Sequence, residues 1–405
     1  MSLIFLSSIF LLFCNKKEKQ ENVSQFGHDI TFLKKHTDVI VLEAPDSPGR
    51  VAIIPGMQAR IMTSSAEGEK GLSFGWINRK LIASGERQKH INAFGGEDRF
   101  WLGPEGGQFS IFFKHGDPFD IEHWQTPEPI DWGPWDLIEK SRQKAVFRKT
   151  FSLVNYSNFQ FDVLAERTIR VLPKKEIEKV LGVQLNTSTK YVGFESDNRI
   201  TNNGNQSWEK STGLLSIWIL GMFNPSPLTT VVIPFKPGPL NTLGPIVNDQ
   251  YFGEVPWNRL KIDKTTNNIY FKADGQYRSK IGISPTRAKN ILGSYDAQRG
   301  VLTLVRFSLD ENAIDYVNSM WEIQDDPYAG DVANSYNDGP PEPGKPPMGP
   351  FYELESSSAA AALQPGETLS HIHQTFHFIG PREALNQIAL KTLQVDLDKI
   401  ASAFN

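Results

Sequence analysis

The chain has 405 residues, of which 39% are hydrophobic and 11% aromatic, so it can bury a large core. Its formal net charge is −4, its pI is about 6.1 and it contains no basic run, which argues against a nucleic-acid partner. A single cysteine excludes any disulfide within the chain. The 32 glycines and 26 prolines, spread along the chain, are typical of many turns between short strands.

Residues 1–22 have the pattern of a targeting segment and tether. An apolar run from Ser2 to Phe13 ends at Cys14, and the chain then turns abruptly polar. A run of about a dozen residues is too short to span a bilayer, which needs about 20. The pattern resembles a bacterial lipoprotein signal, so we predict lipidation of Cys14 and anchoring at the bacterial cell envelope, facing the periplasm or the surface. No positive charge precedes the run and Phe13 is large, so an ordinary signal peptide or a buried free thiol are the alternatives.

From residue 39 to residue 309 the pattern predicts mainly short β-strands. These segments are rich in β-branched and aromatic residues or alternate cleanly, and they are bounded by turns. We predict strands at 39–42, 51–54, 109–113, 145–147, 159–164, 166–172, 183–185 and 301–307. Spacing near ten residues, without a long alternation of strands and helices, indicates an all-β antiparallel fold.

Helices are predicted at only a few places. Asp310 is a good N-cap for residues 311–321, where Ile314, Val317 and Met320 share one face. Pro381 precedes a second helix over 382–390, and a short helix that includes Leu397 and Ile400 follows. We therefore divide the chain into the signal and tether at 1–22, a β domain at 23–380 and a C-terminal helical extension at 381–405. A long proline-rich loop over 324–350 is expected to border a cleft.

The stretch from Asn92 to Phe113 combines glycines and a proline with carboxylates, an arginine and a tryptophan. Such a segment suits polyol binding, because an indole face can cover the apolar side of a sugar ring while charged groups hydrogen-bond to its hydroxyls. Arg99 and Trp101 point the same way in a strand. We predict that Asp98, Arg99, Trp101 and Glu105 bind substrate.

Four segments together resemble the galactose mutarotase-like (aldose 1-epimerase-like) superfamily, in particular its branches of unknown function. They are 50–61, 95–105, 351–358 and 363–367, and they occur in that order along the chain. The resemblance covers roughly residues 39–380. It implies a large antiparallel β-supersandwich with a few peripheral helices, and a carbohydrate ligand.

The resemblance also implies a chemistry. Anomer interconversion needs an acid that protonates the ring oxygen and a base that takes the proton of the anomeric hydroxyl. In the superfamily a histidine is the acid and a glutamate is the base; Glu353 and Glu355 match the glutamate region and share one face of a strand. The usual mid-chain histidine motif is missing from 214–224, so His115 is the expected replacement acid.

Three function classes follow: a sugar epimerase, lyase or hydrolase, an aldose 1-epimerase, or a sugar-binding lipoprotein without turnover. A pocket with an acid and a base around one sugar-sized space would favour the enzymes. A shallow aromatic strip would favour binding alone.

Metal sites and cofactors are weakly indicated, and we expect no cofactor. A His-x-His pair on a strand can bind zinc, but His371, His373 and His377 also fit the polar face of a half-buried strand. Calcium is a second option, through Asp331, Asn334, Asn337 and Asp338, although turn formation explains part of this set equally well. Trp124, Trp132, Trp135 and Trp208 are expected to serve partly as sugar platforms and partly as packing.

Overall fold

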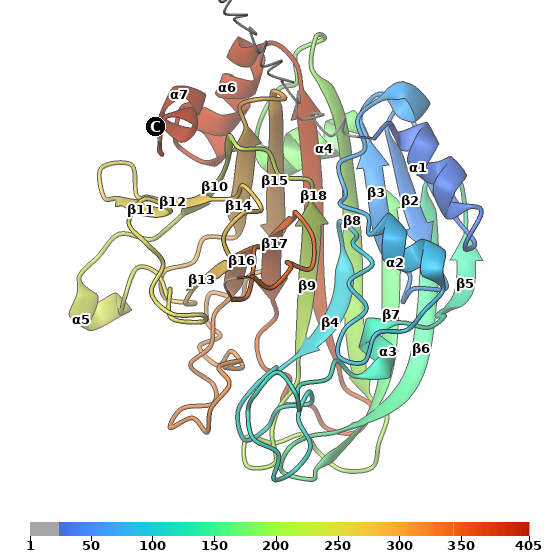
Figure 1. Cartoon of the computed structure of the whole chain (residues 1–405), viewed down its shortest axis with the longest axis vertical. Coiled ribbons are helices and arrows are strands. Elements are labelled where there is room, and N and C mark those ends of the chain that lie inside the picture. The colour runs from blue at the N-terminus through green and yellow to red at the C-terminus, as the bar shows by residue number, and fades with distance from the viewer. Residues whose placement is uncertain (1–23, 343, 405) are drawn as a thin grey trace, which may run out of the picture.

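The computed structural model describes residues 24–342 and 344–404, so Cys14 and the predicted signal lie outside the described residues. These residues form three β-sheets in which neighbouring strands run antiparallel. Two of these sheets pack face to face, and a few short helices lie at the periphery (Figure 1). The predicted all-β antiparallel sandwich with peripheral helices is confirmed.

The largest of the three sheets has ten strands. Its strand order is β11-β12-β10-β14-β15-β18-β8-β7-β6-β5. The strands, in that order, are Leu260–Asp263, Asn268–Lys272, Thr229–Pro234, Ile291–Asp296, Val301–Phe307, Thr368–Ile379, Lys190–Asn202, Gln160–Val171, Lys144–Val154 and Asp136–Lys140. In β7, buried and partly exposed residues alternate over almost the whole strand, as expected where only one face meets the core.

A five-stranded sheet packs on the ten-stranded sheet, and a three-stranded sheet flanks them. The five-stranded sheet has the order β13-β16-β17-β9-β4, with strands Ser279–Ile283, Ala333–Asn337, Tyr352–Ser357, Ser216–Phe223 and Arg99–Gly103. The three-stranded sheet consists of β1 (Ile40–Glu43), β2 (Arg50–Ile54) and β3 (Arg60–Ser65). Phe100 and Ile219 of the five-stranded sheet pack with Phe161 and Phe194 of the ten-stranded sheet.

Helices cover the outer face of the ten-stranded sheet near its middle. The predicted C-terminal helices are confirmed as α6 (Arg382–Thr392) and α7 (Leu397–Ala401), and α4 (Lys174–Leu181) joins them. Leu385 and Ile400 share a core with Leu302 and Phe376 of the sheet. The remaining helices are short: α1 (Phe26–Leu33), the 3₁₀ turn Gly68–Lys70, α2 (Arg79–Ser84), α3 (Glu128–Asp131) and α5 (Leu240–Leu243).

Within the part of the chain that the structure describes, no helix has the length and apolarity needed to cross a bilayer. The proposed division of the chain at residues 22 and 380 stays a prediction.

Several predicted elements are wrong. Residues 311–321 form no helix, because their backbone pairs with a distant segment: Tyr316 N–H donates to Tyr328 O at 2.9 Å, and Gly330 N–H donates to Tyr316 O at 2.8 Å. The carboxylate of Asp310 accepts from Asn312 N–H in a local turn instead of capping a helix. The expected loop over 324–350 contains β16, and no strand forms at 109–113 or 183–185.

A buried ion pair joins the two packed sheets. Arg167 of β7 pairs with Asp98, which directly precedes β4, and both side chains are fully buried. Ser196 Oγ of β8 donates to the second carboxylate oxygen of Asp98 at 2.6 Å, and Arg167 Nε donates to Asn198 Oδ1 at 2.9 Å. Each charge is therefore paired and hydrogen-bonded, as a charge in a dry core must be.

Truncating Arg167 should strongly destabilise the protein. Arg167→Ala would leave the Asp98 carboxylate buried and unpaired, which typically costs about 3–5 kcal/mol of the free energy of unfolding. The matched control is Arg199→Ala on β8, because Arg199 is half exposed and its pair with Asp197 lies at the surface, where such a pair contributes about 0–1 kcal/mol. Urea unfolding of both variants measures the difference, and equal losses would contradict a central role for the buried pair.

Candidate functional site

The outer face of the five-stranded sheet gathers polar and aromatic side chains from all five strands. Because side chains alternate along a strand, the register places Trp101 opposite Trp218, Arg99 and Glu355 on either side of Leu220, and Glu353 opposite Tyr336. Lys280 of β13 lies opposite Tyr336. All these side chains are nevertheless buried, since loops cover this face as well. We call Arg99, Trp101, Trp218, Lys280, Glu353 and Glu355 the acidic–aromatic cluster.

Glu353 pairs with Arg99 inside this cluster, and their side chains are 8% and 2% exposed. The Arg99 guanidinium also lies 5.1 Å from the centre of the Trp101 ring. Burial raises the pKa of Glu353 to about 8; the Arg99 charge opposes this rise, while the neighbouring Glu355 carboxylate adds to it. Burial and the neighbouring carboxylate together outweigh the Arg99 charge, so the net effect is a raised pKa for Glu353.

Glu355 has two strong partners on one carboxylate oxygen, and its carboxyl group also hydrogen-bonds Glu353. Its Oε2 accepts from Trp218 Nε1 at 2.9 Å and from Lys280 Nζ at 3.0 Å. The Lys280 ammonium also lies 4.6 Å from the centre of the Trp218 ring. Burial would lower the pKa of Lys280, but the carboxylates of Glu355, Glu105 and Glu353 outweigh it and raise this pKa. Lys280 therefore stays charged beside Glu355.

A narrow pocket opens beside this pair. The space in it that is open to the centre of a water molecule is about 20 Å³. The pocket is lined by Gly103, Ser216, Trp218, Tyr251, Lys280, Val317, Ser319, Asp331, Asn334 and Ser357. On one side, Tyr251 donates its hydroxyl to Asp331 Oδ2 at 2.6 Å and accepts from Asn334 Nδ2 at 3.1 Å. The pocket thus combines an indole, an ammonium, an amide, a carboxylate and hydroxyls within one small space.

Several buried polar atoms on this face have no hydrogen-bond partner. They are Arg99 Nε, Trp101 Nε1, Ser216 Oγ and Glu355 Oε1. Buried polar groups in native proteins are nearly always hydrogen-bonded, so a group of orphans in one place calls for an explanation. Three donors and one carboxylate oxygen match what a polyol would satisfy on binding.

Glu105 adds a third carboxylate from the loop after β4. Burial raises the pKa of Glu105, and the charge of Lys280 opposes that rise. Its backbone N–H donates to Ser319 Oγ at 3.1 Å, which ties this loop to the segment around 316–330. Gln108 and Gln324 tie the same two segments by reciprocal bonds of 2.8 and 3.0 Å. These two segments close over the pocket.

The structure brings together most, but not all, of the predicted site residues. Arg99, Trp101, Glu105, Glu353 and Glu355 lie in or beside the cluster. Asp98 points to the opposite side of the sheet, where it pairs with Arg167.

The predicted acid, His115, lies away from the cluster. Its side chain is exposed, and its Nδ1 lies 2.8 Å from Tyr156 O. The structure therefore does not bring this histidine to the two glutamates.

Sequence reasoning missed Trp218, Lys280, Tyr251 and the pocket role of Asp331. One signal was available for Lys280: the segment Ser279–Ile283 places a single charge inside an apolar strand. A charge at such a position must find a partner on the covered face.

Neither of the two sets weighed as possible metal ligands converges on one point. Asp338 accepts from Tyr336 and Gly349, and Asn337 Nδ2 donates to Tyr277 O. His371 and His373 both bond Ser356 Oγ at 2.8 Å within the core, and His377 Nε2 lies 2.8 Å from Glu97. Across residues 24–342 and 344–404, no group of three or more histidine, cysteine or acidic side chains is placed to hold a metal ion.

Of the four tryptophans expected to serve partly as sugar platforms, Trp124, Trp135 and Trp208 pack in the core, and Trp132 packs partly buried against a smaller cluster. Their positions correspond to packing.

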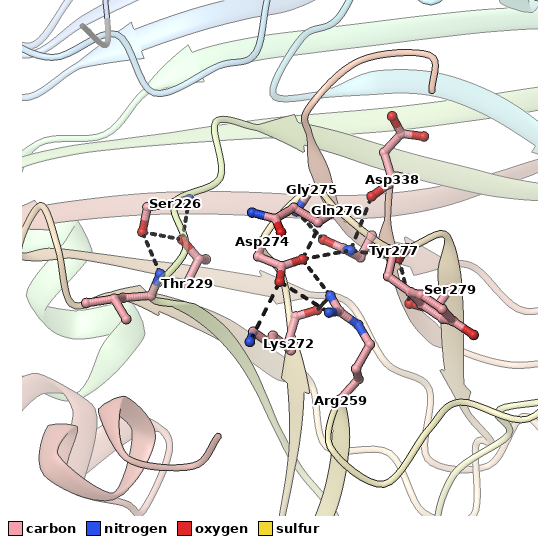
Figure 2. A network of polar contacts seen from close by, with 12 residues as sticks. Ser226, Thr229, Arg259, Lys272, Asp274, Gly275, Gln276, Tyr277, Ser279 and Asp338 are labelled. Atoms are coloured by element: carbon pink, nitrogen blue, oxygen red, sulfur yellow. Dashed lines mark hydrogen bonds and ion pairs between the residues drawn. The ribbon is translucent and has the colours of Figure 1, made fainter. Parts of the chain in front are cut away.

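A second polar network supports β13, the edge strand that carries Lys280. Asp274 forms an ion pair with the guanidinium of Arg259, and its Oδ2 lies 3.8 Å from Lys272 Nζ (Figure 2). Asn337 of β16 accepts from Gly275 N–H at 2.8 Å, which fixes the turn before β13 against the neighbouring strand. At the other end of β13, a Cβ at Gly282 would lie 2.1 Å from Asp331 Oδ2, so only glycine lets Asp331 line the pocket.

Comparison with known sequences assigns a family but no activity. The sequence matches a family of unknown function (DUF6786) over residues 24–404. Among curated proteins, no sequence matches this chain.

Solved structures with a similar fold share little sequence. A protein from Synechocystis sp. PCC 6803 has a TM-score of 0.48 at 14% identity, and the match covers 84% of this chain and 96% of the Synechocystis chain. A galactose mutarotase-like protein from Lactobacillus casei ATCC 334 has a TM-score of 0.48 at 12% identity, covering 84% and 100%. A GalM/aldose epimerase homologue from C. elegans has a TM-score of 0.43 at 10% identity, covering 85% and 100%. Scores this low carry no argument about activity.

Replacing Gly282 should disturb the pocket. Gly282→Ala would force Asp331 away and break its bond with Tyr251, so we expect a loss of about 1–3 kcal/mol of stability from overpacking. Gly56→Ala is the control, because its Cβ would meet only Thr37 Oγ1 at an ordinary 3.4 Å, and it should change stability by less than about 0.5 kcal/mol. Thermal unfolding distinguishes the two, and an unaffected Gly282→Ala protein would contradict this packing.

Proposed function

We propose that this chain, which belongs to the family of unknown function DUF6786, binds a carbohydrate in the pocket of the five-stranded sheet and acts on it by acid–base chemistry. The single observation that carries the proposal is the set of unpartnered buried polar atoms beside two glutamates in unequal environments. Pairs of carboxyl groups whose surroundings separate their pKa values are typical of acid–base sites.

The two glutamates take different roles in this proposal. Glu353 keeps its proton near neutral pH and is the acid, directed at a ring or leaving-group oxygen. Glu355 has one oxygen fixed by Trp218 and Lys280, so the other, Oε1, takes the role of the base that accepts a hydroxyl proton. This pair supplies the acid that the missing mid-chain histidine would have provided. Anomer interconversion, as in an aldose 1-epimerase, is the simplest reaction that needs these two groups and nothing else.

Ligand orientation follows from the remaining cluster residues. The unpartnered Ser216 hydroxyl lines the pocket and is directed at a sugar hydroxyl in this proposal. The Arg99 Nε and Trp101 Nε1 donors are also unpartnered, but they lie buried in the adjoining cluster. The Trp218 indole lines the pocket and offers an apolar surface to ring C–H groups. The segment around 316–330 covers the bound sugar and limits its contact with water.

A sugar-binding protein without turnover is the second candidate. The observation that favours it is that each glutamate is already paired with a cation, Glu353 with Arg99 and Glu355 with Lys280. Such pairs can serve to orient ligand hydroxyls rather than to transfer protons.

The test begins with a screen of monosaccharides and short glycans, followed by product analysis of each ligand. For a sugar that turns over, Glu353→Gln and Glu355→Gln should each reduce turnover by at least a hundredfold while binding persists, because a positioned acid or base contributes about 10²–10⁴-fold. Glu139→Gln is the control, since Glu139 is more than half exposed on β5, and it should behave like the wild type.

The pH profile checks the assignment of the acid. Turnover should fall as the pH rises through about 8, because Glu353 then ionises and can no longer donate. Full turnover in both variants would exclude these glutamates as acid and base. Firm binding without turnover of any sugar would select the second candidate.

Anchoring at the bacterial cell envelope through a lipid on Cys14 is part of the proposal, and it rests on the sequence alone. Cys14→Ser should release the protein from the membrane fraction or leave its precursor uncleaved, because the lipid is attached to the only thiol. Fractionation and gel mobility of the variant measure this. A variant that fractionates and migrates like the wild type would exclude the lipid anchor.

A further inference from the structure

We infer that the ligand is an oligosaccharide, and that sugar units beyond the one in the pocket lie on a strip of exposed aromatic side chains formed by Phe252, Trp257 and Tyr277. We call these three residues the aromatic strip. The inference rests on the proposed function, which it extends from a single sugar to a chain.

Exposed aromatic side chains are confined to one region of the molecule. Phe252 is 44% exposed, Trp257 is 81% exposed and Tyr277 is 44% exposed. Throughout the described residues, every other phenylalanine, tyrosine and tryptophan is buried or only partly exposed. All three exposed rings fall within 252–277, which leads directly into the strand that carries Lys280. A random scatter of surface hydrophobics would not select aromatics in one segment.

The aromatic strip is continuous with the pocket. Tyr251 lines the pocket, and the next residue, Phe252, begins the strip. The Phe252 ring meets Tyr336 edge to face, with ring centres 6.0 Å apart. Tyr336 lies opposite Glu353 in the sheet, so Phe252 adjoins the row of the proposed acid.

Charged neighbours hold the strip in place. The Arg278 guanidinium lies 3.9 Å from the centre of the Phe252 ring, and that of Arg259 lies 5.2 Å from the centre of the Tyr277 ring. Arg259 is itself fixed by Asp274 beside Tyr277 (Figure 2). Trp257 lies in a tight turn that is closed by a hydrogen bond of 2.8 Å from Arg259 N–H to Pro256 O.

This arrangement fits a glycan. Each sugar ring has an apolar C–H face that an aromatic ring can cover and equatorial hydroxyls that a neighbouring guanidinium can bind. Arg278 supplies such a donor next to Phe252, whereas Arg259 is bonded to Asp274 and holds Tyr277 in place. Under the proposed function the pocket holds one sugar unit, and exposed aromatic rings that continue from it are what further units of one chain require.

The test compares affinity with glycan length. Calorimetry on the full chain uses defined glycans of one to six units made of glucose, galactose, mannose or xylose. For the sugar that binds best, affinity should rise with length, at about two- to tenfold for each ring engaged. The triple variant Phe252→Ala, Trp257→Ala, Tyr277→Ala should lose this gain and keep the wild-type affinity for the single sugar. Leu390→Ala on α6, also exposed, should change neither.

Three outcomes would overturn the inference. They are affinity that does not depend on length, a length gain that survives in the triple variant, and a triple variant that alters self-association without altering any sugar affinity. In each case binding of a single sugar would leave the proposed function standing. No binding of any sugar, short or long, would instead overturn the proposed function. The three single variants, each checked by thermal unfolding, separate the roles of the rings if the triple variant is unstable.

Discussion

Glu353 and Glu355 place two carboxyl groups on one buried face of a sheet, and the surrounding residues must compensate for the cost of burying them. Removing a carboxylate from water costs several kcal/mol even after relaxation, and a second carboxylate on the same face adds repulsion. Arg99 and Lys280 each compensate one glutamate, and Trp218 adds a hydrogen bond. The compensation is incomplete, because burial still raises the pKa of Glu353 to about 8. Groups with pKa values shifted in this way cluster at functional sites.

The fold meets this constraint by bringing distant parts of the chain together. The cluster takes residues from β4, β9, β13 and β17, which span the chain from residue 99 to residue 357. These four strands belong to one antiparallel five-stranded sheet. The register between neighbouring strands therefore sets the positions of the charges. The loop after β4 and the segment around 316–330 are joined by Gln108 and Gln324 beside the cluster.

The start of β4 is fixed from both sides of the sheet. Consecutive residues point to opposite faces, so Asp98 pairs with Arg167 in the core while Arg99 pairs with Glu353 on the outer face. This alternation also separates two residues that the sequence had grouped. Asp98 holds the two sheets together, and Arg99 belongs to the site.

Local periodicity was enough to determine the all-β class, the two C-terminal helices, and the fact that Arg99 shares a face with Trp101 and Glu353 with Glu355. These follow from the spacing of side chains along a single strand or helix. Only the tertiary structure decided which face is covered and by what, since that depends on pairing between segments far apart. It placed Lys280 and Trp218 on Glu355 and left His115 at the surface. It also drew residues 311–321 out of a helix, because their backbone bonds with 327–330 satisfy the same donors and acceptors.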